Sequence, residues 1–431
     1  MTVFGMVRPL RIEQRLIDAC EIFNAGRRNE VIADGTSMCV TWGAGNGYTV
    51  SVHKGGESFS KERTNVAELR VGLIGTGKKE KQSDRFGFAM AYQHADGYEK
   101  LDSCEIVACA DIVEQNAADF AETYGVGEDG VFLDYRRMLA EADLDVVSIC
   151  TWMHLHEPMV LDAVKAGVRA IHCEKPMADT WGGARRMAAA AKEAGVELTF
   201  NHQRRYGRAF TLAKGMLEEG RIGRLQRLEC GAGNLYDTGT HFIDMFSFFN
   251  GEVPARWVLG QIDYSQENFV FGSHNENQQV VLTEYENGVF GLIMTGVDTN
   301  PVGCVDRLIG TDGVIEVGVQ QGPPLRIRRA GETDWSEPDV DGESIHGPGF
   351  IDRAVADVIE SLRSGRKCQL EAENALIATE IIFGAYESSR RRGRVDFPLE
   401  VEDNPLAAMV ESGDLKPAPD EEARERMEGA G

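Results

Sequence analysis

Three short segments carry polar residues of types suited to moving a proton and a hydride. One is Glu174-Lys175-Pro176, which follows the apolar run AIHC, and another opens with Asp237 and places His241 four residues later. A carbinol that loses a hydride needs a base for its hydroxyl proton and a cation beside the developing alkoxide. Lys175 is the expected cation, and Asp237 can share a helix face with His241 and orient its imidazole.

The third segment, from Thr151 to His156, follows the apolar run VVSIC. In an α/β sheet the carboxyl ends of parallel strands meet at one edge, where ligands bind. Alone, Lys175 could be a surface lysine, Asp237 a helix cap and His241 an interior histidine, so the inference depends on their occurring together. His154 and His156 could share a strand face, but no cysteine or carboxylate cluster joins them, and we expect no metal.

A nucleotide-binding pattern precedes these segments. The strand LRVGLIG runs into Gly75 and Gly77, which suit a tight turn and a close approach of the backbone to a pyrophosphate. A complete G-x-G-x-x-G is absent because KKEKQSDRF follows, and we attribute the long interval between Gly75 and Asp111 to an insertion there. That acid, Asp111, ends a second strand. It would bind ribose hydroxyls and repel a 2′-phosphate, so NAD is favoured over NADP.

The elements that must position these residues alternate between strand and helix from residue 68 to residue 201. Short apolar strands separated by amphipathic helices predict a doubly wound parallel sheet. The predicted helices span 83–94, 113–124, 135–142, 156–167 and 180–195, and Gly125, Gly167 and Gly195 are expected at helix C-termini.

Beyond residue 201 the pattern changes to strands with short turns, which predicts a large antiparallel sheet. Helices are expected at 209–219, 241–249, 350–362 and 371–391. The resulting domains are an N-terminal extension of unknown role (1–67), a dinucleotide-binding domain (68–201), a substrate and oligomerisation domain (202–400) and an acidic arm or loose tail (401–431). The extension contains helix-like periodicity at 10–23 and the strand-like stretches TSMCVTW and YTVSVH.

Composition narrows the class of protein. The 431 residues carry a formal charge of −24, which opposes binding to nucleic acid or anionic membranes. This negative charge is explained either by a need for solubility or by a salt-rich habitat. The nine cysteines are scattered without a C-x-x-C pair, so we expect reduced thiols. No apolar run reaches the ~18 residues of a membrane span, and acids interrupt the N-terminal stretch. We therefore expect a cytoplasmic protein.

The motifs together resemble the Gfo/Idh/MocA family of oxidoreductases over roughly Glu68 to Leu399. The segments that carry the resemblance are LRVGLIGTG, CADI, HEPMVLDAVKAG, HCEKPMADT and YDTGTHFIDMF. The resemblance implies a Rossmann-type doubly wound sheet followed by a domain with a large open antiparallel sheet. It also implies a homo-oligomer, because the exposed sheet face in such proteins commonly packs against another subunit.

The resemblance further implies roles for individual residues. Lys175 would hold and polarise the reacting hydroxyl, and His241 would exchange its proton with Asp237 assisting. The implied cofactor-binding residues are Gly75, Gly77, Asp111, Thr151, His156, Glu174, Lys175 and Pro176. The implied substrate-binding residues are Trp152, Asn201, Arg204, Arg205, Tyr206 and Tyr236.

By this resemblance the chain is an NAD-dependent oxidoreductase acting on a secondary hydroxyl or ketone of a sugar, glycoside or cyclitol. Two alternatives stay open. One is glycoside cleavage by transient oxidation and elimination, with Tyr206 or Tyr236 as base; the other is a non-catalytic NAD-binding sensor. The chain departs from the family where Trp152 replaces a frequent proline and where the stretch from Gly223 to Asp237 is short, so the substrate is left open.

Overall fold

The chain forms two compact units, Met1–Glu68 and Leu69–Gly431. The computed structural model describes the backbone of the first unit at 28–33, 36–42, 47–54 and 57–64, and the second unit at 69–78, 90–296 and 302–420. The first unit holds an antiparallel sheet in the order β1-β2-β3-β4, formed by Arg28–Ala33, Thr36–Trp42, Gly47–Lys54 and Glu57–Thr64. The two strand-like stretches are thus confirmed as β2 and β3, while the periodicity at 10–23 lies outside the described residues.

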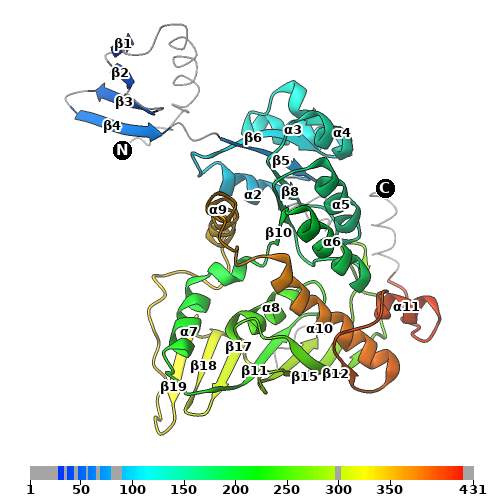
Figure 1. Ribbon diagram of the computed structural model, residues 1–431. Coiled ribbons are helices and arrows are strands. Elements are labelled where there is room, and N and C mark those ends of the chain that lie inside the picture. The colour runs from blue at the N-terminus through cyan, green and yellow to red at the C-terminus, as the bar shows by residue number, and fades with distance from the viewer. Residues whose placement is uncertain are drawn as a thin grey trace. The chain divides into compact units, whose positions relative to one another are not determined.

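The second unit begins with a six-stranded sheet in which every pair is parallel (Figure 1). Its order, β10-β9-β8-β5-β6-β7, confirms the doubly wound prediction. The order reverses between β5 and β8, and this switch point is where such sheets bind ligands beyond their carboxyl ends. The strands are β5 Leu69–Ile74, β6 Cys104–Ala110, β7 Val131–Phe132, β8 Val146–Ile149, β9 Ala170–Cys173 and β10 Glu197–Phe200.

Five described helices accompany this sheet: α2 Ala91–Tyr98, α3 Glu114–Tyr124, α4 Tyr135–Glu141, α5 His156–Ala166 and α6 Trp181–Ala194. Gly125, Gly167 and Gly195 close α3, α5 and α6 in the left-handed conformation, as predicted. The first helix ends at Tyr98 rather than His94, and most of its predicted start lies outside the described residues.

The second sheet has eight strands in the order β19-β18-β17-β11-β16-β15-β12-β20. It is mixed rather than purely antiparallel, because β11 pairs with β16 in parallel while its other pairs are antiparallel. After β11 the chain crosses through a helix, and such a crossover permits parallel neighbours. The strands are β11 Leu225–Ala232, β12 Ala255–Asp263, β15 Gln278–Tyr285, β16 Phe290–Gly296, β17 Cys304–Gly310, β18 Gly313–Val319, β19 Leu325–Arg329 and β20 Val395–Asp396.

The crossover helix α8 (Gly239–Phe249) is buried along its whole length. It contacts β11 and β17 of the sheet and also α10 (Ala372–Arg391), which packs on β12 (Figure 1). The helix α7 (Arg208–Glu218) lies near β18. A small hairpin, β13 (Phe269–Val270) with β14 (Ser273–His274), stands between β12 and β15 in the chain. The polar residues of α8 therefore lie in the interior of the second unit.

The helix α9 (Pro348–Ser364) was predicted within the second domain, yet it packs against α2. Its residues Ile351, Val355 and Ile359 belong to the same buried cluster as α2 and β5. A Cβ added to Gly97 of α2 would lie 3.1 Å from Val355 Cβ, so the glycine permits this close approach. The core of the dinucleotide-binding part is thus completed by a segment that comes more than 250 residues later.

Residues 401–420, predicted as an arm or a loose tail, pack against the rest of the second unit. The short helix α11 (Pro405–Glu411) is capped by Asn404, whose side chain accepts from Leu406 N, and Leu406 and Met409 are buried in the main core. The burial of these two apolar side chains holds the segment in place despite its acidic composition. None of the described helices is both long and apolar enough to cross a membrane.

Candidate active site

The end of β5 makes the tight turn expected of a pyrophosphate loop. Gly75 and Gly77 have φ angles of 80° and 54°, a region that glycine adopts without strain. A Cβ on Gly75 would lie 2.6 Å from the Thr151 side chain and 2.9 Å from the Cys150 carbonyl oxygen. Glycine is therefore required where β5 and β8 end side by side. The backbone of this turn fits a dinucleotide phosphate.

Asp111 directly follows β6 and lies at the same edge of the sheet as this turn. Its carboxylate accepts hydrogen bonds from Gly77 N (2.8 Å), Thr76 Oγ1 (3.2 Å) and Val113 N (2.8 Å). A carboxylate has about four acceptor positions, and Asn116 Nδ2 takes the fourth with the longest of these bonds, at 3.5 Å. The neighbouring Ile112 is 87% exposed and offers an apolar surface instead of a cation, which suits NAD rather than NADP.

Glu174, at the end of β9, is buried in a polar network. Its Oε1 lies 3.0 Å from His94 Nε2 and accepts from Asn201 Nδ2 at 2.7 Å. Its Oε2 accepts from the backbone N of Lys175 at 3.1 Å. Burial alone would raise the pKa of this carboxyl, but the bonds from His94 and Asn201 outweigh it and lower the pKa to about 2. Glu174 is therefore a fixed negative charge beneath the site.

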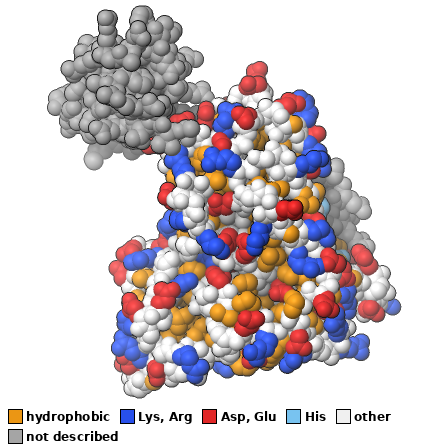
Figure 2. Space-filling model, viewed as in Figure 1, with side chains coloured by type: hydrophobic (Ala, Val, Ile, Leu, Met, Phe, Trp, Pro, Cys, Tyr) orange, Lys and Arg blue, Asp and Glu red, His pale blue; other side chains and the backbone are white. Residues whose placement is uncertain are grey.

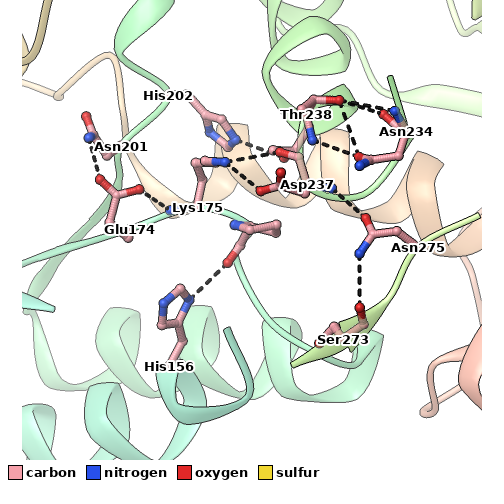
Figure 3. A network of polar contacts seen from close by, with 12 residues as sticks. His156, Glu174, Lys175, Asn201, His202, Asn234, Asp237, Thr238, Ser273 and Asn275 are labelled. Carbon is pink, nitrogen blue, oxygen red and sulfur yellow. Dashed lines mark hydrogen bonds and ion pairs between the residues drawn. The ribbon is translucent and has the colours of Figure 1, made fainter. Parts of the chain in front are cut away.

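The side chains of Lys175, which follows β9, and Asp237, which precedes α8, point toward each other (Figure 3). Its Nζ donates to Asp237 Oδ1 at 2.9 Å and to the Asp237 carbonyl oxygen at 3.1 Å. The turn that carries Asp237 is held by Asn275, whose Oδ1 accepts from Asp237 N at 3.1 Å. Because an ammonium has three donors, one proton of Lys175 is left for a ligand.

His241 lies beside this pair, but Asp237 does not orient it, and that prediction is wrong. α8 begins only at Gly239, so Asp237 precedes the helix and the four-residue spacing does not place both side chains on one helical face. The His241 imidazole makes no hydrogen bond with any described residue, and its Nδ1 is buried. Burial, followed by the charges of Lys175 and Arg204, holds its pKa well below the ordinary value. His241 is therefore neutral.

Arg204 lies near both His241 and Asp306. Arg204 stacks on the Phe242 ring (4.3 Å) and is 9% exposed, and its Nη1 is buried without a partner among the described residues. Asp306, on β17, is fully buried, and neither of its carboxylate oxygens has a partner in the described part of the chain. Asp306 was missed in the sequence. The signal was an acid at an inward position of the strand VDRLIG, between the buried Cys304 and Leu308.

Comparison with known proteins assigns the chain to a family. Residues 69–202 match the oxidoreductase family with an NAD-binding Rossmann fold, and residues 214–397 match the C-terminal alpha/beta domain of the same family. The chain belongs to the Gfo/Idh/MocA family. It is therefore an oxidoreductase that uses NAD and acts on CH–OH groups.

Individual relatives agree with this assignment. The inositol 2-dehydrogenase of Burkholderia lata is 27% identical over 317 residues, which cover 68% of this chain and 87% of that protein. Among solved structures, a levoglucosan dehydrogenase in complex with NADH and levoglucosan aligns with a TM-score of 0.64 at 21% identity, covering 77% of this chain and all of that one. An aldose-aldose oxidoreductase from Caulobacter crescentus gives 0.63 at 19% identity, with the same coverage. The two structures share the fold.

Two residues predicted at the cofactor and substrate sites of this family member lie in the interior instead. His156 is fully buried, with its ring nitrogens 2.9 Å from the Pro176 carbonyl oxygen and 3.1 Å from that of Thr151. His156 thus connects the backbone that follows β8 to the backbone that follows β9. Asn201 is 1% exposed and donates to Glu174, because a buried carboxylate requires hydrogen-bond donors. Trp152 lies against the hairpin, where a Cβ on Gly272 would be 3.1 Å from its ring.

Three more predicted substrate residues are structural. Arg205 is buried, and its guanidinium donates twice to Asp244, at 2.7 Å each. The hydroxyl of Tyr206 donates to Asp357 at 2.6 Å, and that of Tyr236 to the Ala178 carbonyl oxygen. Burial raises the pKa of both tyrosines, and both hydroxyls already donate within the chain; these observations do not favour either as a base for glycoside cleavage, and that role stays a prediction.

The surface carries charged side chains of both signs. On the face in Figure 2, acidic and basic side chains are interspersed rather than gathered in one patch. Within the described residues, no group of three or more His, Cys, Asp or Glu is placed to hold a metal ion.

Proposed function

We propose that this family member is an NAD-dependent dehydrogenase that oxidises a secondary hydroxyl of a cyclitol or a sugar. The observation that carries the proposal is the meeting of Lys175, Asp237 and the unbonded His241 at the carboxyl end of β9. Relatives named inositol 2-dehydrogenase and levoglucosan dehydrogenase support a polyhydroxylated ring as the substrate.

In this proposal the chain's own residues handle the proton. The free N–H of Lys175 donates to the reacting hydroxyl and stabilises the negative charge that develops on its oxygen. Asp237 keeps the ammonium in place, and the neutral His241 takes the proton. Bound NAD supplies a hydride acceptor. Gly75, Gly77 and Asp111 hold its pyrophosphate and adenosine ribose, while Glu174 and Pro176 border the nicotinamide.

The purified chain given NAD and a panel of cyclitols, sugars and glycosides is expected to form NADH with at least one neutral polyol. The measurement is NADH absorbance, with product identified by mass spectrometry. Tight NAD binding with no turnover of any compound would indicate a sensor instead. Release of the aglycone from a nitrophenyl glycoside, dependent on NAD but without net NADH, would indicate redox-neutral cleavage.

We also propose that the chain forms a homo-oligomer through the open face of the second sheet. Leu259, Val280 and Phe290 are 45%, 57% and 36% exposed on three adjacent strands. A two-fold axis at this face would bury the same patch of both copies. Val280→Lys is expected to shift the mass measured by sedimentation toward the monomer. An unchanged oligomer would place the interface elsewhere, and a monomeric wild type would end this proposal.

The proposed location is the cytoplasm. Cys109, Cys150, Cys173, Cys230 and Cys368 are buried free thiols, as suits a reducing compartment. Fractionation of the native host, with detection of the chain by antibody, tests the location, and recovery from an extracellular fraction would contradict it.

A further inference from the structure

The residues that follow the hairpin β13–β14 hold the turn that carries Asp237. Asn275 directly follows β14 and is fully buried, and its Oδ1 accepts from Asp237 N at 3.1 Å (Figure 3). Its Nδ2 donates to the Ser273 carbonyl oxygen at 3.1 Å. An amide satisfies both partners because it carries a donor and an acceptor, whereas an ionised carboxylate would satisfy only the first. Asn275 therefore joins the hairpin to Asp237.

Glu276, the next residue, holds the same turn two residues before Asp237. Its Oε1 accepts from Leu235 N at 2.6 Å, and its Oε2 accepts from the hydroxyl of Tyr386 on α10 at 2.6 Å. Both Glu276 and Leu235 are fully buried. Two consecutive side chains thus bind the backbone N–H groups of Leu235 and Asp237, so the segment after β14 sets the position of the turn.

Asp237 connects Asn275 to Lys175. The N–H of Asp237 donates to Asn275, while its carboxylate and its carbonyl oxygen both accept from the Lys175 ammonium. A shift of Asp237 therefore moves both acceptors of Lys175 together. The side chains of Lys175 and Asp237 are only 18% and 13% exposed, so little water can replace a displaced partner. Asn275 thus acts on the ammonium through a single residue.

The segment 175–179 is bonded to the same parts of the chain. Ser273 Oγ on the hairpin donates to Asp179 Oδ1 at 2.6 Å. The hydroxyl of Tyr236, in the turn described above, donates to the Ala178 carbonyl oxygen. The end of the parallel sheet, the turn and the hairpin therefore form one connected network, in which the hairpin holds both partners of the ion pair.

We propose that Asn275 is a positioning residue for the reaction, because by holding Asp237 N it keeps the Lys175 ammonium where the reacting hydroxyl must meet it. This inference rests on the proposed dehydrogenase function. Asn275 contacts neither substrate nor cofactor in this proposal, and it acts only through Asp237. The hairpin is then part of the apparatus that orients the ammonium, although it lies about 100 residues beyond Lys175 in the chain.

The test compares wild type with Asn275→Ala, and Asn277→Ala is the matched control. Asn277 Oδ1 accepts from Gln266 N at 3.0 Å, a bond of the same kind that does not reach the Asp237 turn. The kcat of Asn275→Ala is expected to fall about 10- to 100-fold, as for a catalytic group displaced by about 1 Å, while KM and NAD affinity change little. Asn277→Ala should keep the wild-type kcat. An equal loss in both variants, or an unchanged kcat in a folded Asn275→Ala, would overturn the role.

A double variant separates positioning from a general loss of structure. In the Lys175→Ala background, Asn275→Ala should lower kcat little further, because the group that it positions is already gone. The same fold loss in both backgrounds contradicts the proposal. Where Asn275→Ala does not fold, Asn275→Asp takes its place in the same comparison. That variant has nearly the same size and still accepts from Asp237 N, but its second oxygen faces the Ser273 carbonyl oxygen.

Chemical labelling tests the role without a substrate. Acetylation of Lys175 by acetic anhydride, relative to the exposed Lys165, is measured by mass spectrometry. It should rise about 2- to 10-fold in Asn275→Ala, the range of one lost hydrogen bond, and stay unchanged in Asn277→Ala. If wild type forms no NADH with any polyol, this difference still supports the positioning of Lys175 although the dehydrogenase proposal has failed. Unchanged labelling of Lys175 in Asn275→Ala overturns the role whatever the activity.

Discussion

Lys175→Ala is expected to lower kcat about 10²- to 10⁴-fold, the range typical of a positioned proton donor or acceptor. The loss follows because Lys175 is the group with a free N–H beside the Asp237 turn, and alanine leaves the developing alkoxide without its cation. NAD affinity should change little, since Gly75 and Asp111 lie elsewhere. Steady-state NADH formation and NAD titration by fluorescence measure the two effects.

The control for this variant is Lys165→Ala, which removes an exposed lysine from the last turn of α5. It should retain wild-type kcat. The melting temperature of Lys175→Ala must also be measured, because Asp237 loses its partner; at 13% side-chain exposure it keeps some contact with water. Full activity in Lys175→Ala would remove the lysine from the proposed chemistry.

Arg205→Met is expected to lower the free energy of unfolding by about 3–5 kcal/mol, the cost of leaving a buried carboxylate unpaired. Arg205 and Asp244 have side-chain exposures of 2% and 1%, and the guanidinium also reaches Glu252 at 2.6 Å. Methionine fills much of the volume but donates nothing to Asp244. Denaturant unfolding followed by circular dichroism gives the difference.

Arg208→Met is the matched control, because that arginine pairs with Asp341 at side-chain exposures of 47% and 70%. Solvent screening limits its loss to about 1 kcal/mol or less. The double variant Arg205→Met/Asp244→Leu should recover part of the stability, since it removes the orphaned charge as well. A variant Arg205→Met of unchanged stability and raised substrate KM would restore the substrate role first predicted from the motif.

Local patterns in the sequence predicted most of the elements around the parallel sheet and their order along the chain. The left-handed glycines at Gly125 and Gly195 end helices because no other residue adopts that conformation so readily. Strand and helix periods depend on neighbours a few residues apart, so five of the six strands of the parallel sheet, all but β7, and the turn at Gly75 could be predicted without long-range contacts. The same reasoning predicted that Lys175 follows a buried strand and that Asp237 opens the segment that contains His241.

Only the tertiary structure decided which side chains are partners. Asp237 bonds to Lys175, 62 residues away, rather than to His241 four residues on, because the helix begins after it. Asn201 faces Glu174 within the interior rather than the cleft. Spacing along the chain does not report where distant strands bring buried charges together. That is why the full burial of Asp306, an acid in an ordinary-looking strand, is known only once β17 is placed within the sheet.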